Sequence, residues 1–97
     1  MKIFNKYSLK QRLNQFLSEV ANKKNKEELK SFFEAILTPE ELKEIPTRLE
    51  IVKMLKTGIS QKKISKALGV GIATITRGSK ELSKGNFKNV ISWHLPN

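Results

Sequence analysis

The sequence predicts an all-α protein of about six helices with a helix-turn-helix at its centre. Apolar residues recur three and four positions apart along most of the chain, which is the period of a helix packed on one side. These segments are separated by glycine, proline and helix-capping residues, and none alternates as a half-buried strand would. The chain, residues 1–97, is expected to form a single domain with a thin core, because a domain this short buries only about 60% of its unfolded surface.

Two helices are predicted after a flexible basic arm at residues 1–7. Ser8 is the expected N-cap of the first, and its apolar stripe consists of Leu9, Leu13, Phe16, Leu17 and Val20. Asn25 and Glu28 have the spacing of a capping box at the start of the second. Its stripe consists of Leu29, Phe32, Phe33 and Ile36. The two stripes exceed what one chain of this length can cover, so we expect an obligate homodimer.

The third predicted helix carries a proline in its interior. It starts at Thr38, an N-cap, followed by Pro39 at the first helical position. Pro46 removes one backbone donor further along, and we expect a kink between Leu42 and Pro46. The helices within residues 8–57 are the predicted dimerisation helices.

Residues 60–83 have the layout of a helix-turn-helix. A short helix capped by Ser60 ends at Gly69, which suits a left-handed C-cap, and a tight turn leads into the next helix. The residues expected to lock the two helices together are Ile64, Leu68, Val70 and Ile75, with the small Ser65 allowing close approach. An ordinary helical hairpin has similar features. A last short helix is predicted within residues 86–97.

The charge distribution favours a nucleic-acid partner. The chain has 19 Lys and Arg against 9 acidic residues, all Glu, for a net charge of +10. Between Lys53 and Lys88 nine basic residues face only Glu81. Such a surface suits DNA, because each phosphate neutralised releases condensed counterions. A solubilising face is the open alternative, and an anionic membrane fits less well because glycines interrupt the basic segment.

The composition argues against an enzyme. One His, no Cys and no Asp provide neither a nucleophile triad nor a metal cluster, so we expect no cofactor. No apolar run approaches the roughly 18 residues of a membrane span, and residues 1–10 lack the apolar core of a signal peptide. We expect a cytoplasmic protein without a membrane partner.

The run from Gly71 to Ser79, GIATITRGS, resembles the recognition-helix signature of the Trp repressor family. Its flanking motifs follow in family order as Leu37-Thr38-Pro39-Glu40, Thr47-Arg48 and Ile59-Ser60-Gln61, and the resemblance covers nearly the whole chain. It implies an intertwined homodimer that binds palindromic operators of tryptophan biosynthesis genes when L-tryptophan, the corepressor, is bound. The alternative is a helix-turn-helix regulator that senses another small ligand or none.

The resemblance also implies a tryptophan site. Arg48 and Arg77 match the two arginines that sandwich the indole, and Arg77 also holds the carboxylate. Thr38 matches a hydroxyl near that carboxylate, while the backbone carbonyls of Ala35 and Leu37 would face the ammonium group. Glu81 lies where the family has a serine whose hydroxyl helps to bind the amino group, and its carboxylate would either strengthen binding of the ammonium group or indicate a different ligand. Two simpler roles remain open: an ion pair of Arg48 with Glu44 on the helix surface, and pairing of Glu81 with neighbouring lysines.

The DNA contacts that the resemblance implies divide into two kinds. Ile72 and Ala73 match positions that approach base edges, with Gly71 beside them. Thr74 and Thr76 match phosphate contacts, and Lys62 lies where the family has a basic residue near a base or a phosphate. The helix start at Ser60 and Gln61 would offer backbone N–H groups to a phosphate. Gly71, Ile72 and Ala73 have few side-chain hydrogen-bonding groups. Recognition of the DNA sequence would therefore depend on bridging water, thymine methyl groups and DNA shape. The chain departs from the family at Pro46, where a glycine is usual, at Ser65, where a basic residue is usual, and in a turn before Ser60 that is one residue shorter.

Overall fold

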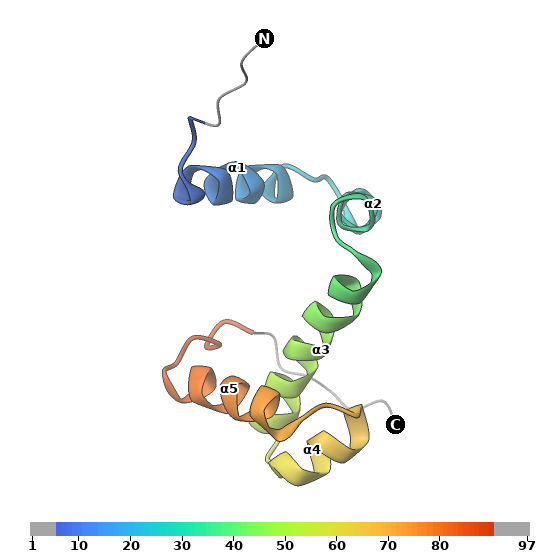
Figure 1. The fold of residues 1–97 in the computed structure, drawn as a ribbon, viewed down its shortest axis with the longest axis vertical. Helices are drawn as coiled ribbons and strands as arrows, with labels where there is room; N and C mark the ends of the chain where they lie inside the picture. The colour runs from blue at the N-terminus through green and yellow to red at the C-terminus, as the bar shows by residue number, and fades with distance from the viewer. Residues whose placement is uncertain (1–5, 91–97) are drawn as a thin grey trace. The chain divides into compact units, whose positions relative to one another are not determined.

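A computed structural model describes residues 6–90 of the chain, and these residues contain five helices and no strand (Figure 1). The helices are α1 (Leu9–Ala21), α2 (Lys26–Ile36), α3 (Pro39–Lys56), α4 (Gln61–Leu68) and α5 (Ile72–Ser83). The prediction of an all-α chain is therefore confirmed. The sixth predicted helix is not formed at residues 86–90, which are turns and a bend, and its remainder lies outside the described residues, as do residues 1–5 of the basic arm. The chain divides into two compact units, Met1–Pro39 and Glu40–Asn97.

Both helices of the first unit are capped as predicted at their N-termini. The Ser8 hydroxyl accepts the Gln11 N–H, and the Gln11 side chain accepts the Ser8 N–H in return, which completes a capping box. The Asn25 side chain accepts the Glu28 N–H at 2.9 Å. The reciprocal half of this second box differs from the prediction, because the Glu28 carboxylate accepts the N–H of Lys24 rather than that of Asn25.

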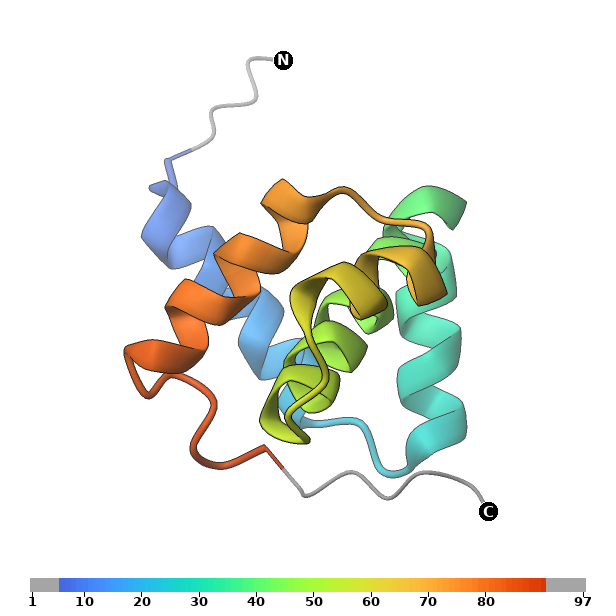
Figure 2. The same cartoon turned by 90° about the horizontal axis from the view of Figure 1, so that it is seen from below.

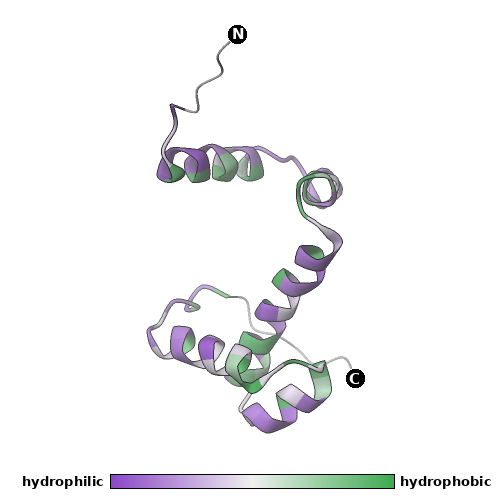
Figure 3. Ribbon diagram, in the orientation of Figure 1, coloured by the Kyte–Doolittle hydropathy of each residue, from purple (hydrophilic) through white to green (hydrophobic). Residues whose placement is uncertain are grey.

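The first unit buries very little of its apolar surface. Phe16 of α1 meets Phe32 and Phe33 of α2, with ring centroids 6.0 and 6.4 Å apart, but no residue of either helix is fully buried. The outer stripe of α1 is exposed, at 73% for Leu9, 53% for Leu13 and 52% for Leu17. Figure 3 shows the apolar residues gathered along one side of α1. The predicted excess of apolar surface is present in this unit.

Helix α3 is continuous through its internal proline. It starts at Pro39 and places Glu40 and Glu41 in its first turn, where acidic side chains favour the positive end of the helix dipole. Pro46 has no N–H to donate to the carbonyl of Leu42, yet helical residues continue on both sides of it. The proline thus costs one hydrogen bond without ending the helix.

The core of the second unit joins α3 to the helix-turn-helix. Its buried cluster consists of Ile51, Met54, Ile64 and Ile75, with Leu55, Ile59, Leu68 and Val70 packed against it. Ile64 of α4 and Ile75 of α5 both have 0% exposure. Figure 2 shows α4 lying beside the C-terminal half of α3. The predicted locking residues of the helix-turn-helix are confirmed as members of this core.

The turn between α4 and α5 is fixed by one glycine and one serine. Gly69 is the C-cap of α4 at φ 66° and ψ 33°, the left-handed conformation that glycine adopts without steric cost. The Ser65 hydroxyl donates to the carbonyl oxygen of Val70 at 2.6 Å. This bond gives a structural reason for serine at that position, since it fastens the end of α4 to the turn.

After α5 the chain turns back toward α3. Gly85, at φ 81°, donates its N–H to the Leu82 carbonyl at 3.0 Å. The Lys56 ammonium group donates to the carbonyl oxygen of Phe87 at 3.2 Å. This contact ties the segment after α5 to the C-terminal end of α3.

Residues 6–90 offer neither a membrane span nor a metal cluster. None of the helices described is both long and apolar enough to cross a bilayer. No group of three or more His, Cys, Asp or Glu side chains in this part of the chain is arranged to hold a metal ion.

Candidate ligand site and nucleic-acid interface

One face of α5 lies across from one face of α3, and a cavity separates them. The α5 face consists of Thr74, Arg77, Gly78 and Glu81, at the spacing i, i+3, i+4 and i+7 that aligns side chains along a helix. The α3 face consists of Arg48, Ile51 and Val52, which follow the same rule. The cavity has a volume of about 190 Å³, and Phe87 of the turn after α5 completes its lining. The two arginines predicted to bind a ligand are thus brought to one site.

We call this cavity of about 190 Å³ the ligand cavity, and its lining combines cationic and apolar groups. Ile51 and Val52 are buried at its floor, whereas Arg48 and Arg77 are exposed. Guanidinium groups at the edge of an apolar hollow suit a ligand that has both an aromatic ring and a carboxylate, because arginine stacks on rings and forms charge-assisted hydrogen bonds. The cavity therefore has the chemistry expected of a site for an aromatic acid.

Gly78 allows α5 to approach α3 closely. A Cβ atom at this position would lie 3.3 Å from Cγ2 of Ile51 and 3.9 Å from both Val52 and Leu55. Because Ile51 is buried in the core, it has little room to retreat. The glycine thus fixes the depth of the ligand cavity.

Gly78→Ala is expected to lower the free energy of unfolding by about 1 kcal/mol. Alanine favours a helix interior by about 1 kcal/mol over glycine, but the added methyl group crowds Ile51, and overpacking costs about 1 to 3 kcal/mol. Urea denaturation followed by circular dichroism measures the difference. Ser79→Ala, a neighbouring change with a gain in helix propensity, is the control and should be neutral or slightly stabilising. A Gly78→Ala variant more stable than the wild type would show that the close approach does not constrain this position.

Glu81 presents a carboxylate to the ligand cavity. Its two oxygens accept hydrogen bonds from the side-chain amide of Asn86 and from the Lys84 ammonium group, the latter at 3.2 Å. These two hydrogen bonds, Asn86 first, and the positive charge of Lys84 lower the pKa of Glu81 below its ordinary value of 4.5. The group is therefore anionic at neutral pH. The predicted pairing with a neighbouring lysine is observed, and the carboxylate also lines the cavity.

Arg48 does not form the surface ion pair that was the simpler alternative. Among the described residues, ion pairs within 4.0 Å join Lys23 to Glu19 and Lys84 to Glu81, and neither involves Arg48. Its guanidinium group borders the ligand cavity instead. This leaves it available to a ligand.

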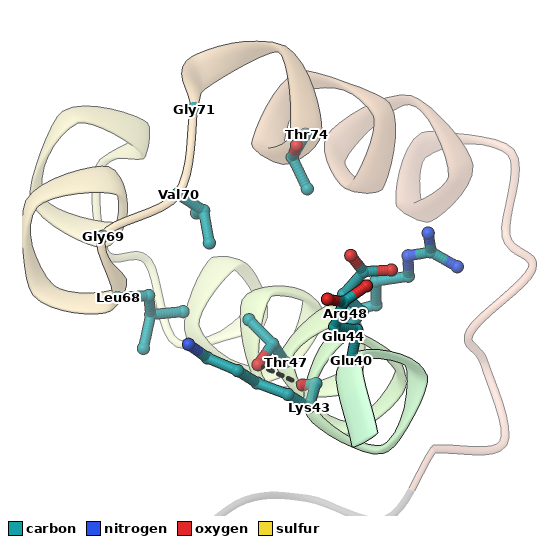
Figure 4. A pocket seen from close by; sticks show the side chains of 10 residues that line it. All are labelled: Glu40, Lys43, Glu44, Thr47, Arg48, Leu68, Gly69, Val70, Gly71 and Thr74. Atoms are coloured by element: carbon teal, nitrogen blue, oxygen red, sulfur yellow. Dashed lines mark hydrogen bonds between the residues drawn. The ribbon is translucent and has the colours of Figure 1, made fainter. Parts of the chain in front are cut away.

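A larger cavity of about 480 Å³ lies on the other side of Arg48, between α3 and the turn of the helix-turn-helix. Figure 4 shows its lining, with Glu40, Lys43 and Glu44 along α3 and the Thr47 hydroxyl donating to the Lys43 carbonyl at 2.7 Å. Arg77 does not line it. This cavity lacks the predicted arginine pair and is lined by two carboxylates, Glu40 and Glu44, so it is the less suitable of the two for an aromatic acid.

The predicted DNA-contacting residues lie at the start of α4 and along α5. Ser60 caps α4 by accepting the Lys63 N–H at 3.3 Å, which holds the helix N-terminus in shape. The Thr76 hydroxyl donates to the side-chain carbonyl of Gln61 at 3.2 Å, a bond that joins the two helices of the motif. Gln61 keeps its amide N–H groups for other acceptors. The sequence did not indicate this hydrogen bond between Thr76 and Gln61.

The other members of the predicted DNA surface are open to solvent. Gly71 is the N-cap of α5, and Ala73 lies in the first turn of that helix. Both are exposed, as is Lys62 in the first turn of α4. Ile72, in the first turn of α5, is 49% exposed, so its side chain is accessible to a partner molecule. Thr74, predicted to contact phosphate, lines both cavities and so lies on the side of α5 that faces α3.

Three predicted ligand residues belong to the first unit. Ala35 lies in the last turn of α2, and Leu37 is the C-cap of that helix, donating its N–H to the Phe33 carbonyl at 2.8 Å. Thr38 lies between α2 and α3. The structure describes this unit by itself, so the contribution of these residues to the ligand site stays a prediction.

The sequence did not reveal four residues that line the ligand cavity: Ile51, Val52, Gly78 and Phe87. The helical spacing from Arg48 indicates the first two, and the spacing from Arg77 indicates Gly78. Phe87 lies within a turn whose path no sequence pattern predicts.

A helix-turn-helix whose second helix also borders a ligand cavity defines the class of protein as a helix-turn-helix transcription regulator. The chain belongs to the Trp repressor protein family, whose sequence model matches residues 11–93. This is a family of regulatory transcription factors rather than enzymes.

Individual relatives support this assignment. The chain is 54% identical over 48 residues to a "Trp operon repressor homolog" of Vibrio vulnificus (strain YJ016), covering 48% of this chain and 47% of the relative. It is 39% identical over 70 residues to proteins of the same name from Aliivibrio salmonicida (strain LFI1238) and Aliivibrio fischeri (strain MJ11), covering 71% of this chain and 65% of each relative. The match thus spans about half the length of the first relative and just under two thirds of the other two.

Proposed function

We propose that this protein is a cytoplasmic transcriptional repressor that binds palindromic operator DNA as a homodimer when L-tryptophan occupies the ligand cavity. The observation that carries the proposal is the cavity that places Arg48 and Arg77 together between α3 and α5. Since α5 is the second helix of the helix-turn-helix, a ligand in this cavity touches the element that would read DNA. The family and the names of its relatives support tryptophan as the ligand and a tryptophan operon as the target.

The cavity lining can bind each part of tryptophan separately. The indole ring would lie on Ile51 and Val52 with Arg48 and Arg77 at its faces, and Arg77 would also pair with the carboxylate. Glu81 would accept the ammonium group, for which its lowered pKa keeps it charged. The family resemblance also predicts ligand contacts from Thr38 and from the backbone carbonyls of Ala35 and Leu37.

DNA binding would use the exposed sides of α4 and α5. The N-terminus of α4 at Ser60 and Gln61 offers backbone N–H groups to a phosphate, as helix N-termini commonly do. Lys62 and Thr76 provide further phosphate contacts, and Thr74 lies where it could serve both DNA and ligand. Ile72 and Ala73, at the first turn of α5 after Gly71, would approach base edges in the major groove.

Dimerisation would cover the apolar stripe of the first unit. Leu9, Leu13 and Leu17 are all more than half exposed in the isolated chain, and fully burying one leucine gains about 1.5 to 3 kcal/mol. A second copy presents the same stripe, and twofold symmetry makes such a surface self-complementary. The resulting pair of helix-turn-helix heads matches the two halves of a palindromic operator.

One observation favours a second candidate function, a helix-turn-helix regulator with a different ligand. Glu81 already accepts hydrogen bonds from Asn86 and Lys84, so a ligand ammonium group must compete with both. An aromatic acid without an amino group meets no such competition at the arginines. Indole-3-propionate is the probe that separates this candidate from tryptophan.

The test is selection of binding sites from a randomised duplex DNA pool, with and without L-tryptophan, followed by calorimetric titration with each of the twenty amino acids. The proposed function predicts one palindromic sequence enriched in the presence of L-tryptophan, and L-tryptophan as the tightest ligand. Enrichment of the same palindrome without any ligand would favour a ligand-free regulator. A pool without a preferred sequence would contradict specific DNA binding altogether.

Substitutions in the helix-turn-helix should separate affinity from sequence preference. Lys62→Ala and Thr76→Ala are expected to weaken binding to all DNA sequences alike, because phosphate contacts position a protein without reading bases. Ile72→Ala is expected to alter which operators are selected, since a mismatched base pair in a specific site typically costs about 1 to 3 kcal/mol. The measurement is the same selection repeated with each variant. Loss of affinity without altered preference in the Ile72 variant would remove Ile72 from the base-reading surface.

A further inference from the structure

The turn after α5 brings an aromatic ring to the ligand cavity. Phe87 is half-buried and lines the cavity of about 190 Å³ together with Arg48 and Arg77. It lies ten residues beyond Arg77 in the sequence, outside any helix. Neither the helical spacing along α5 nor the motifs of the helix-turn-helix assign it a role.

Several hydrogen bonds hold the backbone of this turn in place. The backbone carbonyl of Phe87 accepts both the Lys56 ammonium group of α3 and the N–H of Val90, each at 3.2 Å. The preceding residue, Asn86, donates its backbone N–H to the Glu81 carbonyl at 3.3 Å and its side-chain amide to the Glu81 carboxylate. The turn is therefore fastened to both helices that form the cavity.

The lining of the ligand cavity has a charged part and an apolar part, and Phe87 belongs to the apolar part. The charged groups at its border are Arg48, Arg77 and Glu81, whereas its apolar lining is provided by Ile51, Val52 and Phe87. Ligand sites typically combine such an apolar wall with a few polar groups that fix orientation. The polar groups suit the carboxylate and ammonium of an amino acid, so the ring system of the ligand belongs against the apolar lining. Of the three apolar residues, only Phe87 lies outside the helices.

We propose that Phe87 is a specificity-determining residue of the ligand cavity, whose ring limits the size of the aromatic ligand that fits between α3 and α5. The inference rests on the proposed function, because it takes tryptophan as the ligand. Removing the ring opens the cavity on one side, where a larger ligand gains contacts and tryptophan loses them.

The test is calorimetric titration of the full 97-residue chain with L-tryptophan and with L-tryptophans methylated at single ring positions. Phe87→Ala is expected to weaken L-tryptophan binding about 10-fold and to improve binding of at least one methylated analogue relative to L-tryptophan about 10-fold. The expectation follows from the value of one methylene group in an apolar pocket, about 10- to 200-fold. Phe87→Leu keeps an apolar side chain and should shift the same ratio by a smaller factor.

A matched control separates cavity lining from stability. Leu82→Ala removes a half-buried apolar side chain from the end of α5 that does not line the cavity, so the ratio of methylated to unmethylated affinity should stay at the wild-type value. An unchanged ratio in both Phe87 variants, or an equal change in Leu82→Ala, would overturn the inference while leaving tryptophan as the ligand. If the wild type bound no tryptophan although it selected an operator, the ligand itself would be wrong and this inference would fall with it.

Discussion

Ile75→Ala is expected to destabilise the second unit by about 3 to 4 kcal/mol. Ile75 has 0% exposure and packs in one cluster with Ile51, Met54 and Ile64, and truncation of a buried isoleucine to alanine costs about 2 to 5 kcal/mol. Small domains are stable by only about 5 to 15 kcal/mol in total. The variant should therefore show a markedly lower denaturation midpoint in urea and a partly unfolded helix-turn-helix at physiological temperature.

Ile72→Ala provides the matched control for this experiment. The two isoleucines lie three residues apart on α5, but Ile72 is 49% exposed, and changes at such positions usually stay within about 0.5 kcal/mol. The same denaturation measurement on both variants therefore tests the buried and exposed sides of one helix. Equal losses of stability would contradict the packing described for α5.

Arg77→Ala is expected to abolish the response of DNA binding to tryptophan. Arg77 lies on the helix that would read DNA and borders the ligand cavity, so the substitution removes both a stacking surface and a carboxylate partner. The lost charge-assisted hydrogen bond alone is worth about 1.5 to 3 kcal/mol, or about 10- to 150-fold in affinity. Calorimetry should show this loss for L-tryptophan, and operator affinity measured with and without tryptophan should become equal.

The wild type should show reciprocal coupling in the same measurements. The factor by which tryptophan raises operator affinity must equal the factor by which the operator raises tryptophan affinity. Lys80→Ala is the control, because Lys80 is an exposed cation on the same helix that does not line the cavity. It should weaken DNA binding and leave the coupling factor intact. A tryptophan response preserved in Arg77→Ala would show that the ligand acts through another residue.

The local elements of this fold could be predicted from the sequence because each depends on neighbouring residues. The Ser8 and Asn25 caps, the start of α3 at Pro39 and the left-handed Gly69 are set by chemistry within one helical turn. The inward residues of the helix-turn-helix, such as Ile64, were likewise evident from helical spacing. Predictions of this kind needed no knowledge of how the helices meet.

The ligand cavity could be predicted only in part, because it depends on how closely two helices approach. The order of the sequence motifs predicts that Arg48 and Arg77 share one site. The close approach of α5 to α3 at Gly78 depends instead on tertiary packing, which no local pattern indicates. The path of the chain after Gly85 is another, since it depends on the bond from Lys56 to the Phe87 carbonyl. For this reason residues 86–90, where the sequence predicts the start of a last helix, form turns and a bend instead.

The division of α5 into three faces restricts how a protein of this design can change over evolutionary time. Its twelve residues are shared among the core at Ile75, the cavity at Arg77 and Glu81, and the exposed side at Ala73. A substitution at Ile75, at Arg77 or at Ala73 therefore alters a different one of these surfaces. The turn that carries Phe87 belongs to none of the five helices and lines the ligand cavity. Under the proposed function, a change of ligand that keeps the recognised DNA sequence is therefore expected to begin with substitutions in that turn rather than in α5.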